Sequence, residues 1–105
     1  MITAKIINNT DNAVKIRVRH NGEPLDFSAV QYMIATFENS EVVASSADNE
    51  ELIQFNSEGE ITMRFGSLGI AAGDRRVTIT AFDPLHDDGQ IIIDETTHNL
   101  VLRFT

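Results

Sequence analysis

The chain contains no cysteine and no tryptophan, and it has only two prolines and one tyrosine. Without cysteine there is no disulfide, thiol nucleophile or thiolate metal ligand, as expected of a protein made in a reducing cytoplasm. No apolar run reaches the roughly 18 residues that a membrane helix needs, so we expect no membrane partner. The segment Met1–Lys5 lacks a basic stretch followed by an apolar one, so no signal peptide is predicted.

Basic residues are also scarce, because eight lysines and arginines stand against 16 acids and the net charge is −8. Such a chain repels a phosphate backbone unless its bases gather on one face. The arginines available for such a face are Arg17, Arg19, Arg64, Arg75, Arg76 and Arg103. All but Arg75 lie in predicted strands, and we expect no nucleic-acid partner.

Motifs that carry catalysis are missing as well. The three histidines, His20, His86 and His98, have no spacing that suggests shared ligation of a metal. No glycine-rich loop follows a strand and opens a helix, and no serine sits in a nucleophile elbow. We therefore predict a protein that is not an enzyme and holds no cofactor.

One loop could offer oxygen ligands to calcium, because the segment Asp83–Gly89 contains three carboxylates. Their spacing does not match the alternating acids of a helix-loop-helix calcium site, and no glutamate follows in register. We interpret this segment, and the acidic run Asp48–Glu51, as solvated loops and predict no metal site.

What the chain does contain is apolar and polar residues that alternate with a period of two. In a strand this pattern places the apolar side chains on one face and the polar ones on the other. The residues predicted to face the core are Val14, Ile16, Val18, Ile61, Met63, Phe65, Val77, Ile79, Leu100, Leu102 and Phe104. Strands that bury only one face are what stacked sheets require.

Less regular strands are predicted at Ile2–Ile7, Ala29–Phe37, Glu41–Ser45, Glu51–Phe55 and Gln90–Asp94. Turn residues separate the strands, among them Asn21-Gly22, after which Pro24 restricts any following strand to a sheet edge. A single helical turn is predicted at Ser67–Ala72, capped by Gly73. About eight or nine short strands at such spacing are typical of a sandwich or a small barrel. We predict an all-β fold, a two-sheet antiparallel β-sandwich, forming one domain over residues 1–105.

Some apolar residues are not explained by a single core. Ile91-Ile92-Ile93 places isoleucine on both faces of one strand, while Phe82 and Val101 interrupt polar outward faces. Either a central strand is buried on both faces, or an exposed strand meets another protein. We take Ile92, Val101 and Phe82 as the candidate protein interface, with Ile92 as the outward isoleucine.

The order of features also resembles a known family. A polar strand ends at Asn21-Gly22, Pro24–Val30 leads into a strand, and Gly59–Met63 follows. Ala72-Gly73 then precedes the strand Arg76–Phe82, and Asn99–Phe104 is the last strand. This order is similar to that of the small immunoglobulin-like domains of tailed-bacteriophage virion proteins, in particular the N-terminal domain of baseplate upper proteins. The likeness covers nearly the whole chain as a pattern, without a specific motif.

The resemblance implies an immunoglobulin-like sandwich that acts as a structural building block of a virion, in a tail, a baseplate or the capsid surface. Its partners would be other virion proteins or copies of itself in an oligomeric assembly. The alternative is a β-sandwich domain that binds carbohydrate or another ligand. Sugar platforms favour exposed tryptophan and tyrosine, whereas this chain has no tryptophan, only Tyr32, and six phenylalanines that the core needs.

Overall fold

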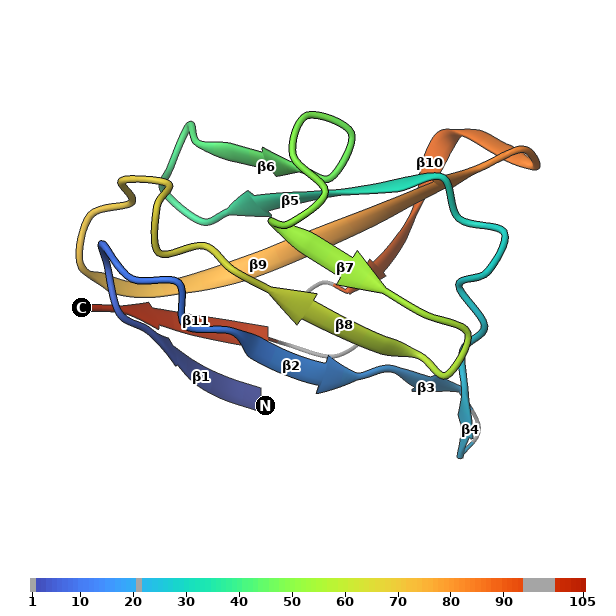
Figure 1. Ribbon diagram of the computed structural model, residues 1–105, viewed down its shortest axis with the longest axis horizontal. Coiled ribbons are helices and arrows are strands. Elements are labelled where there is room, and N and C mark those ends of the chain that lie inside the picture. The colour runs from blue at the N-terminus through green and yellow to red at the C-terminus, as the bar shows by residue number, and fades with distance from the viewer. Residues whose placement is uncertain (1, 21, 94–99) are drawn as a thin grey trace.

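The computed structural model describes residues 2–20, 22–93 and 100–105, and Figure 1 shows that the chain is built from strands. The described residues contain no helix, and therefore none that could cross a membrane. The all-β prediction is confirmed. The strands are β1 (Ile2–Ile6), β2 (Val14–Arg17), β3 (Arg19–His20), β4 (Glu23–Pro24), β5 (Tyr32–Phe37), β6 (Val43–Ser45), β7 (Ile53–Phe55), β8 (Glu60–Met63), β9 (Gly73–Asp83), β10 (His86–Ile93) and β11 (Leu100–Phe104).

The larger sheet has six strands and is organised around β9, which is 11 residues long. One edge of β9 pairs with β5, which pairs in turn with β6. The other edge is shared, because β11 pairs with its first half and β10 with its second half. All these pairs are antiparallel, and β1 completes the sheet by pairing in parallel with β11.

The remaining strands form a three-stranded antiparallel sheet, in the order β2-β8-β7, and the small β3–β4 hairpin. β4 contains Pro24, which has no N–H to donate to a ladder, and it pairs with β3 alone among the described strands, so it is an edge strand as the sequence predicted. Gly22 has a φ of 83°, as the tight turn requires. Asn21, the other turn residue, lies outside the described residues.

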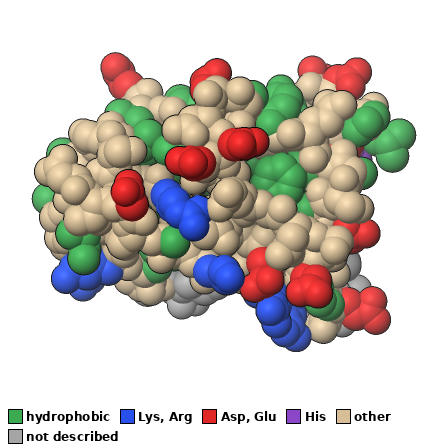
Figure 2. Space-filling model, in the orientation of Figure 1, with side chains coloured by type: hydrophobic (Ala, Val, Ile, Leu, Met, Phe, Trp, Pro, Cys, Tyr) green, Lys and Arg blue, Asp and Glu red, His purple; other side chains and the backbone are tan. Residues whose placement is uncertain are grey.

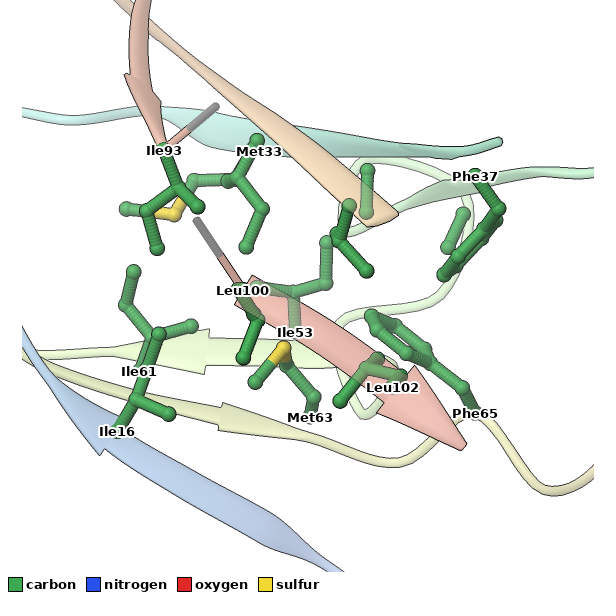
Figure 3. Close-up of a cluster of buried hydrophobic side chains, with 14 of the residues drawn as sticks. Ile16, Met33, Phe37, Ile53, Ile61, Met63, Phe65, Ile93, Leu100 and Leu102 are labelled. Carbon is green, nitrogen blue, oxygen red and sulfur yellow. The ribbon is translucent and has the colours of Figure 1, made fainter. Parts of the chain in front are cut away.

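The buried side chains of both larger sheets form one cluster (Figure 3). In this view Ile93 and Met33 of the six-stranded sheet point toward Ile61 and Ile16 of the three-stranded sheet. The rings of Phe37 and Phe65 also meet in a T-shaped arrangement, with centroids 5.2 Å apart. Burying a side chain of this size stabilises the fold by about 1.5–3 kcal/mol, so this cluster is what joins the sheets.

The predicted core set is confirmed, except that Val14 is only partly buried at the edge of the cluster. The helical turn predicted at Ser67–Ala72 is wrong. Gly69 has a φ of 74°, which breaks a right-handed helix, and Leu68 closes a simple turn by donating its N–H to the carbonyl of Phe65.

The loop predicted at Asp83–Gly89 is also largely wrong. Only Pro84 and Leu85 form the turn, and the chain then continues as β10 from His86 onward. The register between β10 and β9 shifts between His86 and Gln90. Such an irregularity allows glycine and aspartate, which are unusual in regular strands, to lie within β10.

Candidate protein-interaction face

The outer face of the six-stranded sheet, opposite the core, carries a group of side chains without any charge. On β5 and β9 these side chains are direct cross-strand partners, because Tyr32 lies opposite Phe82, Ile34 opposite Thr80 and Thr36 opposite Thr78. β10 adds Ile91 opposite Thr80, and β6 adds Val43 opposite Thr36. We call this group the uncharged face; it consists of Tyr32, Ile34, Thr36, Val43, Thr78, Thr80, Phe82 and Ile91.

The two margins of the uncharged face carry its exposed large apolar side chains. Ile91 on β10 and Val43 on β6 are each 54% exposed. Between them, Ile34 and Thr80 are half-buried by their neighbours on the sheet. Large apolar side chains at this exposure have little stabilising role in the isolated chain, so they are available for contact with another molecule.

Phe82 lies on this outer face, as predicted, but its own chain covers it on two sides. The ring of Tyr32 stacks on it with centroids 4.5 Å apart. On another side the backbone of β10 passes close to the ring at Gly89. A Cβ added to Gly89 would lie only 2.7 Å from a carbon of the Phe82 ring. Gly89 also has a φ of 87°, so glycine is required there for two reasons. Phe82 therefore supports the uncharged face from within.

The prediction that Ile92 is the outward isoleucine is wrong. Ile91 is the exposed one, Ile92 is half-buried against the core, and Ile93 is fully buried. The register between β10 and β9 shifts between Ile91 and Ile93, because Ile91 pairs with Thr80 whereas Ile93 pairs with Ile79. Such a bulge breaks the strict alternation of side chains, so that two consecutive isoleucines can both contact the core.

The structure does not bring Val101 together with Phe82. Val101 lies opposite Arg76, and Phe82 lies six positions further along β9, roughly 20 Å along a strand. Val101 is half-buried and lines a hollow of about 320 Å³ whose other lining residues are largely charged. There Arg103 donates from Nε to Oδ1 of Asp74 over 2.8 Å, and this bond lowers the pKa of the Asp74 carboxyl.

Basic side chains are confined to a few parts of the chain. Residues 20–63 and 77–102 contain no lysine or arginine, so β5, β6, β10 and the second half of β9 have none. In Figure 2 hydrophobic and acidic side chains occupy the corner where Figure 1 places the β9–β10 hairpin, and no basic side chain is visible there. The uncharged face is therefore bordered on the β10 side by acids.

Several arginines outside residues 20–63 and 77–102 bond to carboxylates or backbone carbonyls. Arg17 lies 3.4 Å from a carboxylate oxygen of Glu60, whose pKa is lowered chiefly by a hydrogen bond from the Asn56 amide. The guanidinium of Arg75 donates to the carbonyls of Glu38 and Asn39. These bonds take up donors that a phosphate backbone would need.

The acids of the β9–β10 hairpin do not form a group that could hold a metal ion, and no such group of three ligand residues occurs in the described ranges. Asp83 instead closes the turn, since its Oδ1 accepts from the N–H of Leu85 and lies 2.9 Å from Nδ1 of His86. The hydrogen bond with His86 is the main cause of the lowered pKa of Asp83. Asp87 and Asp88 are exposed, and His98 lies outside the described residues.

No protein-family model, no curated protein and no solved structure matches the chain.

The residues that sequence reasoning missed are Ile91, Val43, Tyr32 and Ile34. A signal for two of them was present, because β5 reads Tyr-Met-Ile-Ala-Thr-Phe and is apolar on both faces. A strand of this kind is either central and covered on both sides or part of a contact surface.

Proposed function

We propose that the chain is a structural module without catalytic activity, which binds other proteins through the uncharged face as a component of a bacteriophage virion. The observation that carries the proposed binding is this face itself. On a chain with 23% charged residues, eight neighbouring outward side chains carry no charge, and two of them are large and 54% exposed. A surface patch without charge, with exposed aliphatic side chains and a charged border, is typical of a protein contact.

We further propose that the two larger sheets form an immunoglobulin-like sandwich. The strand order supports this, because β2-β8-β7 corresponds to strands B, E and D of that fold, and β5-β9-β11 to strands C, F and G. β6 then takes the place of strand C′ beside C. In this assignment the uncharged face lies on the sheet that contains strands C, F and G.

The assignment to a virion rests on the resemblance of the strand and turn order to immunoglobulin-like domains of tailed bacteriophages. A virion is a symmetric assembly, in which a weak contact through a small face is repeated many times. The module would be a tail, baseplate or capsid-surface protein, and it would associate with other virion proteins or with its own copies.

Carbohydrate binding is less well supported. A sugar platform needs an accessible aromatic face, and in this chain Tyr32 and Phe82 cover one another with their planes 11° apart. The hollow beside Val101 is large enough for a small ligand, but its charged side chains include Asp74 and Arg103, which are already bonded to each other.

The proposal is tested by purifying phage particles that encode the chain and analysing them by mass spectrometry. Peptides of this chain should be recovered in a fixed ratio to other virion proteins. The variant Ile91→Asp should fold but be depleted from particles, because it places a charge in the contact. Ile7→Asp is the matched control, since Ile7 is 45% exposed and lies outside the uncharged face.

Absence of the chain from purified particles would contradict the virion assignment. Equal incorporation of both folded variants would contradict the use of the uncharged face. Specific binding on a glycan array that is lost in Tyr32→Ala would instead favour the carbohydrate alternative.

A further inference from the structure

The strand β10 has an unpaired edge. It pairs with β9 on one side, and no strand among the described residues pairs with it on the other. An edge of this kind presents backbone N–H and C=O groups in a row that an added strand can use. The edge adjoins the uncharged face, because Ile91 of β10 is one of its exposed margins.

Other sheet edges in the described part of the chain are less suited to adding a strand. β1 and β2 carry Lys5 and Lys15, and a lysine on an edge strand discourages pairing with another chain. β6 and β7 have only three residues each. β10 has eight residues, with register irregularities toward β9 between His86 and Gln90 and between Ile91 and Ile93. Its last four residues, Gln90–Ile93, include three β-branched side chains and no lysine.

The charge around this edge selects the kind of strand that it can accept. Residues 77–93 contain three acids, Asp83, Asp87 and Asp88, and no lysine or arginine. Asp87 and Asp88 are exposed at the start of β10. A second copy would bring the same acids and another net charge of −8 to the contact, which Coulomb repulsion disfavours. A segment with basic residues complements the edge.

We propose that the free edge of β10 binds an extended segment of a different protein by strand addition, and that this segment carries lysine or arginine beside a β-branched centre. Backbone hydrogen bonds would join it to Gln90–Ile93, and alternate side chains would extend the uncharged face beyond Ile91. The basic residues would lie near Asp87 and Asp88. This inference rests on the proposed function, because it names the partner of the same face.

The test uses the intact chain, isotope-labelled for NMR, and two synthetic peptides of alternating threonine and valine. One peptide has paired lysines at its ends and the other has paired glutamates. The lysine peptide should slow hydrogen exchange at the amides of Gln90–Ile93 and shift their resonances. The glutamate peptide should leave them unchanged, and added salt should weaken the binding of the lysine peptide.

A charge reversal provides the matched control. Asp87→Lys combined with Asp88→Lys should weaken binding of the lysine peptide about tenfold or more, as expected when several screened ion pairs turn into repulsions. Glu23→Lys combined with Glu58→Lys makes the same change in net charge at exposed positions outside β10, and it should weaken binding less than about twofold. Equal losses in both double variants would show that only net charge matters and would overturn the proposal.

Two further outcomes would also overturn it. One is a lysine peptide that leaves the β10 amides unprotected, or protects another edge instead. The other is protection of the same amides in concentrated protein without peptide, which would assign the edge to a second copy. The peptide experiment and the particle experiment test different proposals. If the peptide does not bind but Ile91→Asp is depleted from particles, strand addition is wrong and the proposed function is still supported. Conversely, peptide binding by a chain absent from particles would reject only the virion assignment.

Discussion

The ring of Tyr32 lies flat against the ring of Phe82, with centroids 4.5 Å apart and planes inclined by 11°. The two residues are direct partners in the β5–β9 ladder, on the face of the sheet that points away from the core. Their stacking removes aromatic surface from water without help from the core. The pair therefore joins two central strands and supports one end of the uncharged face.

We expect this stacking to be measurable as a coupling in a double-mutant cycle. Tyr32→Ala and Phe82→Ala, alone and together, should give a coupling free energy of about 0.5–1.5 kcal/mol in urea unfolding. Tyr32→Ala combined with Thr78→Ala is the control, because Thr78 lies four residues from Phe82 along β9, and these effects should add. Additive effects for the aromatic pair would show that the stacking has no role in stability.

The buried glycine in the β7–β8 turn, Gly59, should be hard to replace. A Cβ added to Gly59 would lie 2.5 Å from the carbonyl oxygen of Val18, which is backbone and cannot rotate away. Gly69 has a similar positive φ but nothing within 4 Å of an added Cβ. Gly69→Ala should therefore cost only about 1 kcal/mol for the backbone strain, and Gly59→Ala clearly more. Thermal unfolding of both variants tests this, and equal costs would contradict the packing at Gly59.

Much of the fold could be predicted from the sequence because alternation reports directly which face of a strand is buried. In β8 and β11 every predicted inward residue is buried, for example Ile61 and Leu102. A slip of one residue would expose the whole apolar set, so the pattern determines the register. Val14 is the exception, because β2 lies at the edge of its sheet, where burial is incomplete.

The candidate site could not be predicted in the same way, because it depends on irregularities that the alternation does not report. The bulge between Ile91 and Ile93 decides which isoleucine is exposed. The irregularity between His86 and Gln90 allows a segment with loop composition to form part of a strand. Both depend on how β10 packs against β9, which is a tertiary property, and local sequence patterns carry no direct signal for it.

Acid should destabilise the fold through a small number of carboxyl groups. The pKa of Asp74 is lowered by its hydrogen bond with Arg103, and that of Asp83 by its hydrogen bond with His86, both from a usual value of 3.8. A group with a lower pKa in the folded state stabilises the protein above its unfolded pKa, and this contribution is lost as the pH falls through the folded pKa. We expect the free energy of unfolding to be level above about pH 5 and to decline below about pH 4.

The contribution of Asp74 can be isolated with two variants. Asp74→Asn should make the acid decline less steep, and Arg103→Gln should do the same, because each removes the same ion pair. The double variant should add little to either one. An unchanged acid profile in both variants would show that this exposed pair contributes nothing to the pH dependence.

Calcium should have no effect on stability. Asp83 already accepts from the N–H of Leu85 and bonds to His86, so it closes the turn and is not free to join Asp87 and Asp88 around an ion. Melting temperatures in calcium and in a chelator should therefore agree. A rise in melting temperature with calcium that disappears in Asp87→Ala would identify the hairpin as a metal site.

The three consecutive isoleucines of β10 should respond very differently to truncation. Ile93 is fully buried against the core and lies opposite the equally buried Ile79, so Ile93→Ala should cost about 2–5 kcal/mol, as should Ile79→Ala. Ile91 is 54% exposed, and Ile91→Ala should cost less than about 1 kcal/mol. Ile92 is half-buried against the core, so its truncation should fall between these values. Chemical unfolding of the four variants provides the measurement.

A regular strand without the bulge would place Ile91 and Ile93 on one face and Ile92 on the other. The order Ile93, Ile92, Ile91 in decreasing cost therefore tests the bulge itself, and equal costs at Ile91 and Ile93 would refute it.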